Sequence, residues 1–151
     1  VPDSADHRAY LGLSEQKSVF AVPEIAAPVA IIEIFSMYCP HCQREAPIVN
    51  NLYNIIQNRP NLKGKIALIG IGVGNTQYEV DYFRKAYDIP FPLFPDPDFA
   101  IHGLMGEVRT PYFVAIQKEK GGGHRVIYSE LGGFGKPDAF LDLILQKSEL
   151  E

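Results

Sequence analysis

Two cysteines, Cys39 and Cys42, are the only ones in the 151-residue chain, and just two residues separate them. Pro40 follows Cys39 and suits the first position of a helix, so we expect Cys39 at the helix N-cap. A thiol there faces unpaired N–H groups and the positive end of the helix dipole, which favour the thiolate. Because the thiolate is the nucleophile in disulfide exchange, the spacing predicts that Cys39 attacks and Cys42 resolves the mixed disulfide.

His41 lies between the two cysteines, and we expect it to add positive charge or a hydrogen-bond donor near Cys39. Attacking thiols in such pairs have pKa values of roughly 3.5 to 7.5, and we expect Cys39 in the lower half of that range. Cys39, His41 and Cys42 are also three ligands that suit Cu(I) or Zn²⁺. They are crowded on one helical turn without an evident fourth ligand, so we expect no metal, and a copper-binding chaperone is the alternative from another class.

The segments on either side of the cysteines have opposite patterns. Residues 30–35 are apolar except for Glu33, which predicts a strand buried on both faces of a parallel or mixed sheet. Burial makes a carboxylate costly to ionise, so the pKa of Glu33 should rise. A helix with a core-facing stripe should follow, kinked at Pro47. We expect that stripe to consist of Ile48, Leu52, Ile55 and Ile56.

The rest of the chain alternates between strand and helix patterns. In the first part of the chain, we expect a short strand in 18–25, a buried strand at 65–73 and a helix from the Thr76 N-cap to about 87. In the second part, we expect a short strand at 91–95, a short helix from Asp98 to 104, a hairpin of 112–117 with 125–131, and a last helix from Pro137. This order predicts an α/β fold with a central mixed sheet flanked by helices.

These motifs together resemble the thioredoxin superfamily. Cys39-Pro40-His41-Cys42 is typical of DsbA-like disulfide oxidases, and Pro47 matches the helix-kinking proline of thioredoxins. The overall layout is closer to the TlpA/ResA-like extracytoplasmic reductases, with a short strand and helix inserted ahead of the Pro111 loop. The resemblance implies a thioredoxin-like fold and a thiol–disulfide oxidoreductase, with a TlpA/ResA-like reductase expected and a DsbA-like oxidase as the alternative. Peroxidase activity has less support, because the local motif of a lone peroxidatic cysteine is absent.

The resemblance also implies roles for single residues. Glu33 corresponds to the buried acid that exchanges a proton with Cys42, and Thr110-Pro111 corresponds to the cis-proline loop that faces the cysteines and pairs with substrate. Glu45 matches an acidic position of ResA-like proteins, although helix-end electrostatics alone would also account for an acid there. Tyr38 stands where thioredoxins usually have Trp. Residues 66–73 of the neighbouring strand are all apolar or glycine, so they lack the Lys that approaches the buried acid in thioredoxins, which should leave Glu33 more desolvated.

Composition restricts the remaining possibilities. The length fits one domain, which we expect at 18–151 after an extension at 1–17. A net charge of −4 without a basic run gives no support for nucleic-acid binding. We expect no cofactor beyond a redox-active Cys39–Cys42 disulfide. The expected partners are protein thiols or disulfides and a membrane-bound or soluble redox partner. No signal peptide or membrane anchor is evident, and the resemblance favours the periplasm or another extracytoplasmic space.

Overall fold

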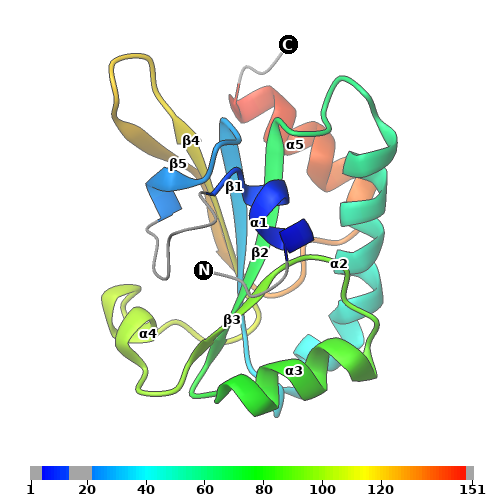
Figure 1. Cartoon of the computed structure of the whole chain (residues 1–151), viewed down its shortest axis with the longest axis vertical. Coiled ribbons are helices and arrows are strands. Elements are labelled where there is room, and N and C mark those ends of the chain that lie inside the picture. The colour runs from blue at the N-terminus through cyan, green and yellow to red at the C-terminus, as the bar shows by residue number, and fades with distance from the viewer. Residues whose placement is uncertain (1–4, 14–21, 149–151) are drawn as a thin grey trace.

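A five-stranded mixed sheet forms the centre of the protein, in the strand order β3-β2-β1-β4-β5 (Figure 1). The structure is a computed structural model of the chain, and it describes residues 5–13 and 22–148. Its strands are β1 Val29–Phe35, β2 Ile66–Val73, β3 Leu93–Asp96, β4 Tyr112–Lys118 and β5 His124–Leu131. Its helices are α1 Ala5–Leu11, the 3-10 helix η1 Val22–Glu24, α2 Pro40–Asn58, α3 Gln77–Ala86, α4 Ala100–Leu104 and α5 Pro137–Ser148. The predicted α/β class and mixed sheet are confirmed.

Strand β1 is the middle of the sheet, and all seven of its side chains are buried. It runs parallel to β2 and antiparallel to β4, and its C-terminal end leads directly into the cysteine segment. β3 extends the parallel part beyond β2, and β5 pairs antiparallel with β4 as the predicted hairpin. This central placement explains the nearly continuous apolar run in the sequence.

Alternate residues of β1 face two separate cores. Ile31 and Phe35 join the core that α2, α3 and α5 cover, whereas Ile32 and Ile34 join the core beneath α1. Figure 1 shows α2 and α5 on one side of the sheet and α1 in front of it. Because side chains alternate along a strand, Glu33 shares its face with Ile31 and Phe35, which is the face that α2 covers.

The buried residues of α2 are only partly those of the predicted core-facing stripe. Cys42, Ala46, Val49, Leu52 and Ile56 are its buried residues, whereas Ile48 and Ile55 are only half-buried. Burial of Cys42 accounts for the correction, because steps of three and four residues from position 42 lead to 46, 49, 52 and 56. The helix contains Pro47, and the kink predicted there stays a prediction.

The N-terminal helix α1 docks on the sheet through its last turn. Leu11 is fully buried, and the hydroxyl of Tyr10 accepts a hydrogen bond of 2.7 Å from the backbone N–H of Leu68 on β2. Burial raises the pKa of Tyr10. The boundary predicted at residue 17 lies outside the described residues. So does half of the strand expected in 18–25, but Val22–Glu24 form a 3-10 helix, so the described part of the prediction was wrong.

The predicted insertion, β3 followed by α4, lies between α3 and β4, and the carboxylate of Asp96, not that of Asp98, accepts hydrogen bonds from the first turn of α4. One carboxylate oxygen of Asp96 accepts from Ile101 N at 3.0 Å and the other from His102 N at 2.9 Å. Asp96 is the buried last residue of β3, so its carboxylate is held beside the first turn of α4. Phe99 occupies the N-cap position of α4 without a side-chain cap, and Asp98 is exposed, so the cap predicted at Asp98 was wrong.

Candidate active site

Cys39 is the N-cap residue of α2, and Pro40 occupies the first turn, as the spacing predicts. Its backbone is extended, with φ −84° and ψ 113°, and its Sγ accepts a hydrogen bond of 3.2 Å from the backbone N–H of Cys42. The thiol therefore occupies the place that a serine or aspartate oxygen takes at other helix starts. Cys39 is half-buried, Cys42 is fully buried, and both are free thiols.

The two thiols have opposite acidities. Burial raises the pKa of Cys39, but hydrogen bonds from the side chains of Cys42 and Thr110 and from the backbone N–H groups of Cys42 and His41 outweigh it, so the pKa lies below its usual value. For Cys42, burial raises the pKa, and the hydrogen bond with Cys39 and the negative charge of Glu33 raise it further. The partly accessible sulfur is thus the one that ionises more easily, which agrees with the predicted order of attack.

Thr110 and Pro111 lie opposite Cys39. The peptide bond between them is cis, and the Cys39 thiol donates to the carbonyl oxygen of Thr110 over 3.6 Å. Pro111 is buried, and its own carbonyl oxygen accepts from Gly132 N at 2.8 Å, which ties this loop to the end of β5. The loop after α4 therefore brings a backbone carbonyl to the sulfur across 71 residues of sequence.

Glu33 is buried on the α2 side of β1, with 4% of its surface exposed. Burial, followed by the negative charges of Glu45 and Cys39, raises the pKa of Glu33 to about 8. Its neighbour on β2 is Gly70, and β2 consists of buried apolar residues and glycine, so that strand places no cation beside it. A carboxyl with this pKa can both hold and release a proton near neutral pH.

Glu33 should make the folded protein less stable as the pH rises. A pKa of about 8 in the folded protein lies above the ordinary 4.5, so the folded state holds a proton that the unfolded chain has lost. Stability is therefore lost between these two values, by up to about 1.4 kcal/mol per pH unit. Glu33→Gln removes this dependence. In urea unfolding, we measure the free energy of unfolding of the variant minus that of the parent, and we expect this difference to be more favourable to the variant at pH 8.5 than at pH 5. An equal difference at both pH values would contradict the assignment.

His41 and Glu45 form a pair one turn apart on α2, with His41 Nε2 3.5 Å from Glu45 Oε1. Glu45 lies in the second turn, so the simple helix-end explanation of this acid is wrong, because that effect is confined to the first turn. The His41 imidazole faces Glu45, and the contribution of His41 to the acidity of Cys39 comes through its backbone N–H. An effect of its side-chain charge on Cys39 stays a prediction.

Gly133 packs against the Glu45 carboxylate, a contact that the sequence does not predict. A Cβ added at Gly133 would come within 2.6 Å of this carboxylate. The other oxygen, Oε2, is buried and finds no hydrogen-bond partner within the described part of the chain. The Gly132-Gly133 pair directly after β5 is the signal that the sequence offers for this contact.

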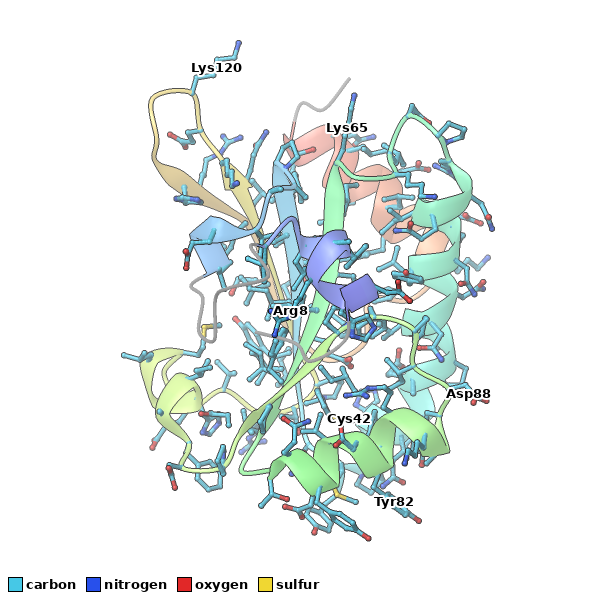
Figure 2. All side chains as sticks on the ribbon, in the orientation of Figure 1. Arg8, Cys42, Lys65, Tyr82, Asp88 and Lys120 are labelled. Carbon is cyan, nitrogen blue, oxygen red and sulfur yellow. The ribbon has the colours of Figure 1, made fainter. Side chains whose placement is uncertain are left out.

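The loop before Cys39 is fixed by residues from several elements. Tyr38 is 66% exposed, and its hydroxyl hydrogen-bonds the carboxylate of Glu79 on α3. Two residues that the sequence did not single out, Asn75 and Gln43, bind the backbone of Met37. Figure 2 shows Cys42 toward the end of the molecule where α3 and its Tyr82 lie. The site is therefore built at the C-terminal end of β1 and β2, between α2, α3 and the Pro111 loop.

Comparisons with solved structures give the fold of the chain. A secreted disulfide oxidoreductase of Mycobacterium tuberculosis, described as homologous to DsbE of Escherichia coli, superposes with a TM-score of 0.63 at 16% identity, over 84% of this chain and 87% of that one. StoA from Bacillus subtilis superposes with a TM-score of 0.62 at 17% identity, over 78% of this chain and 83% of that one. The fold is thioredoxin-like. At these identities the similarity concerns the fold alone.

Sequence comparison adds a distant relationship to known oxidoreductases. No family model matches the chain. The thiol-disulfide oxidoreductase ResA of Geobacillus thermodenitrificans is 25% identical over 87 residues, which are 58% of this chain and 47% of ResA. The chain spans about half the length of the first curated relatives that it matches. Across the described residues, no helix is both long and apolar enough to cross a membrane.

Proposed function

We propose that this chain is a thiol–disulfide oxidoreductase of the TlpA/ResA-like type, which reduces disulfides in protein substrates through Cys39 and Cys42. The observation that carries the proposal is the pairing of a partly exposed N-cap thiol of lowered pKa with a fully buried thiol of raised pKa. The distant similarity to ResA supports the same reaction.

The reaction begins when the Cys39 thiolate attacks one sulfur of a substrate disulfide. The Cys39–substrate bond forms as the substrate S–S bond breaks, and the departing substrate sulfur takes up a proton. Thr110 and Pro111 are the proposed substrate-binding segment, because the Thr110 carbonyl lies beside the attacking sulfur and an extended substrate can pair with this backbone.

Resolution requires Cys42 to lose its proton. We assign Glu33 as the acceptor of this proton, directly or through a water, because its raised pKa lies near neutral pH. Its negative charge also raises the pKa of Cys42, so the two groups interact. The Cys42 thiolate then attacks Cys39, which releases the substrate as a dithiol and leaves the Cys39–Cys42 disulfide. Two electrons pass to the substrate, and a membrane-bound or soluble dithiol donor must return them.

A disulfide oxidase is the second candidate. The hydrogen bonds that favour the Cys39 thiolate also stabilise the reduced pair, which makes a couple more oxidising, and the Cys-Pro-His-Cys sequence is typical of DsbA-like oxidases. The same atoms serve both directions. An extracytoplasmic location suits both candidates, and the Mycobacterium tuberculosis protein with a similar fold is described as secreted.

Two measurements test the proposal. Purified protein should accelerate the reduction of insulin by dithiothreitol. Equilibration with glutathione buffers should give a potential nearer to that of thioredoxin, about −270 mV, than to that of DsbA, about −120 mV. A potential near the DsbA value would favour the oxidase. Stoichiometric copper in the purified protein without insulin reduction would replace the enzyme with the copper-binding alternative.

A further inference from the structure

The four-residue turn 36–39 connects β1 to α2 and carries the attacking sulfur at its end. Three successive backbone N–H groups of the turn have assigned acceptors. Cys39 N donates to Ser36 O at 3.1 Å, Tyr38 N to the Ser36 hydroxyl at 3.2 Å, and Met37 N to Asn75 Oδ1 at 2.9 Å. The first two bonds are local, whereas the third joins the turn to a residue 38 positions away.

Asn75 is buried, and the backbone around it leaves space for its side chain. Only 1% of its surface is exposed, and it follows the C-terminal end of β2. Its backbone N–H donates to Gly72 O at 3.2 Å, and a Cβ added at Gly72 would come within 2.8 Å of Asn75 Oδ1. The absence of a side chain at Gly72 thus leaves the space from which the amide of Asn75 reaches Met37.

Gln43 holds the other side of Met37. Its Nε2 donates to the carbonyl oxygen of Met37 at 2.9 Å from α2, one residue beyond Cys42. The two peptide groups that flank Met37 are therefore bonded by side chains from two different elements, one after β2 and one on α2. The Met37 side chain packs against the core on the α2 side, which leaves this residue little freedom to rotate.

We infer that Asn75 and Gln43 are positioning residues, which hold the Met37 backbone and through it keep Cys39 Sγ in contact with its hydrogen-bond partners. The partner that favours the thiolate is the Cys42 N–H at 3.2 Å, whereas the Thr110 carbonyl oxygen at 3.6 Å accepts from the protonated thiol. Hydrogen bonds weaken steeply as their geometry departs from the optimum, so a turn that rotates around Met37 loses the bond from Cys42 N that favours the thiolate. The inference rests on the thiol–disulfide exchange proposed above and adds that the side chains of Asn75 and Gln43 control the reactivity of Cys39.

The test uses Asn75→Ala and Gln43→Leu in the reduced full chain. The rate of Cys39 alkylation by iodoacetamide is measured against pH, with thermal unfolding recorded in parallel. Loss of one hydrogen bond, about 1 kcal/mol, corresponds to about a fivefold change, so each variant should react up to about fivefold more slowly at a pH below the pKa of Cys39. The double variant should show less than the product of the two effects, because both side chains hold the same residue.

Asn50→Ala is the matched control. Asn50 also makes long-range side-chain bonds to the backbone, from its Nδ2 to Tyr87 O at 2.8 Å and to Asp88 O at 3.4 Å, and neither partner belongs to the turn. This control should lose stability and keep the alkylation profile of the parent. The inference is overturned if the profile of Asn75→Ala and of Gln43→Leu matches that of Asn50→Ala. If Asn75→Ala does not fold, Gln43→Leu alone decides, because Gln43 lies on a partly exposed position of α2.

Insulin reduction by the parent protein, measured on the same samples, separates this inference from the proposed function. An inactive parent whose alkylation still slows in both variants refutes the proposed enzyme and supports the positioning role. An active parent whose alkylation is the same in all variants supports the enzyme and refutes the positioning role.

Discussion

Replacing Cys39 with serine is expected to reduce insulin reduction to the background rate of dithiothreitol alone. A serine hydroxyl does not ionise near neutral pH, so the first S–S bond is never attacked. The fold should survive, because a serine oxygen at the N-cap can accept the hydrogen bond that Cys42 N gives to Cys39 Sγ. The measurement is the insulin assay, with thermal unfolding as the check on folding.

The outcome for Cys39→Ser separates the reaction from nonspecific effects. Loss of activity with an unchanged unfolding temperature supports the assigned nucleophile. Residual activity above a tenth of that of the parent would contradict it, because Cys42 is fully buried and has a raised pKa, so it cannot take over the attack.

The second large effect is expected for Cys42→Ser, which should capture substrates as stable mixed disulfides. Cys39 still attacks, but no thiol remains to displace the substrate. Incubation with a cysteine-containing substrate protein in its disulfide form should give a covalent complex on non-reducing gels, and dithiothreitol should dissolve it. The double variant Cys39→Ser/Cys42→Ser is the matched control and should give no complex. A complex formed by Cys39→Ser and not by Cys42→Ser would reverse the order of attack.

The sequence allowed the central part of the fold to be predicted because local signals agreed there. An apolar run, a proline at the first helical position and two cysteines define β1, the N-cap and the start of α2. The capping box of Thr76 with Glu79 likewise defines the start of α3. Each of these features depends on residues within a few positions of one another, so sequence spacing carries the information.

Where the prediction failed, contacts between distant elements decide. The phase of the α2 stripe follows from burial of Cys42, which depends on the docking of α2 against the sheet. Asn75 was not identified because a lone buried asparagine gives no spacing signal, and its partner lies 38 residues away. The contact of Gly133 with Glu45 joins the end of β5 to α2 and gives no local pattern either.

The acid–base character of the site was partly predictable. Glu33 in an apolar strand predicts a raised pKa from burial alone, and the structure agrees. The additional effect of Glu45 required the tertiary structure, because it depends on the side of α2 that faces β1.

The most direct test of the account is a titration of the Cys39 thiolate, followed by absorbance at 240 nm as the difference between reduced and oxidised protein. Because the pKa of Cys42 is raised, Cys39 should titrate alone over acidic and neutral pH. The account predicts a transition well below the ordinary thiol value of about 8.5. A transition at that ordinary value would contradict it, because the hydrogen bonds at the N-cap would then not activate the sulfur.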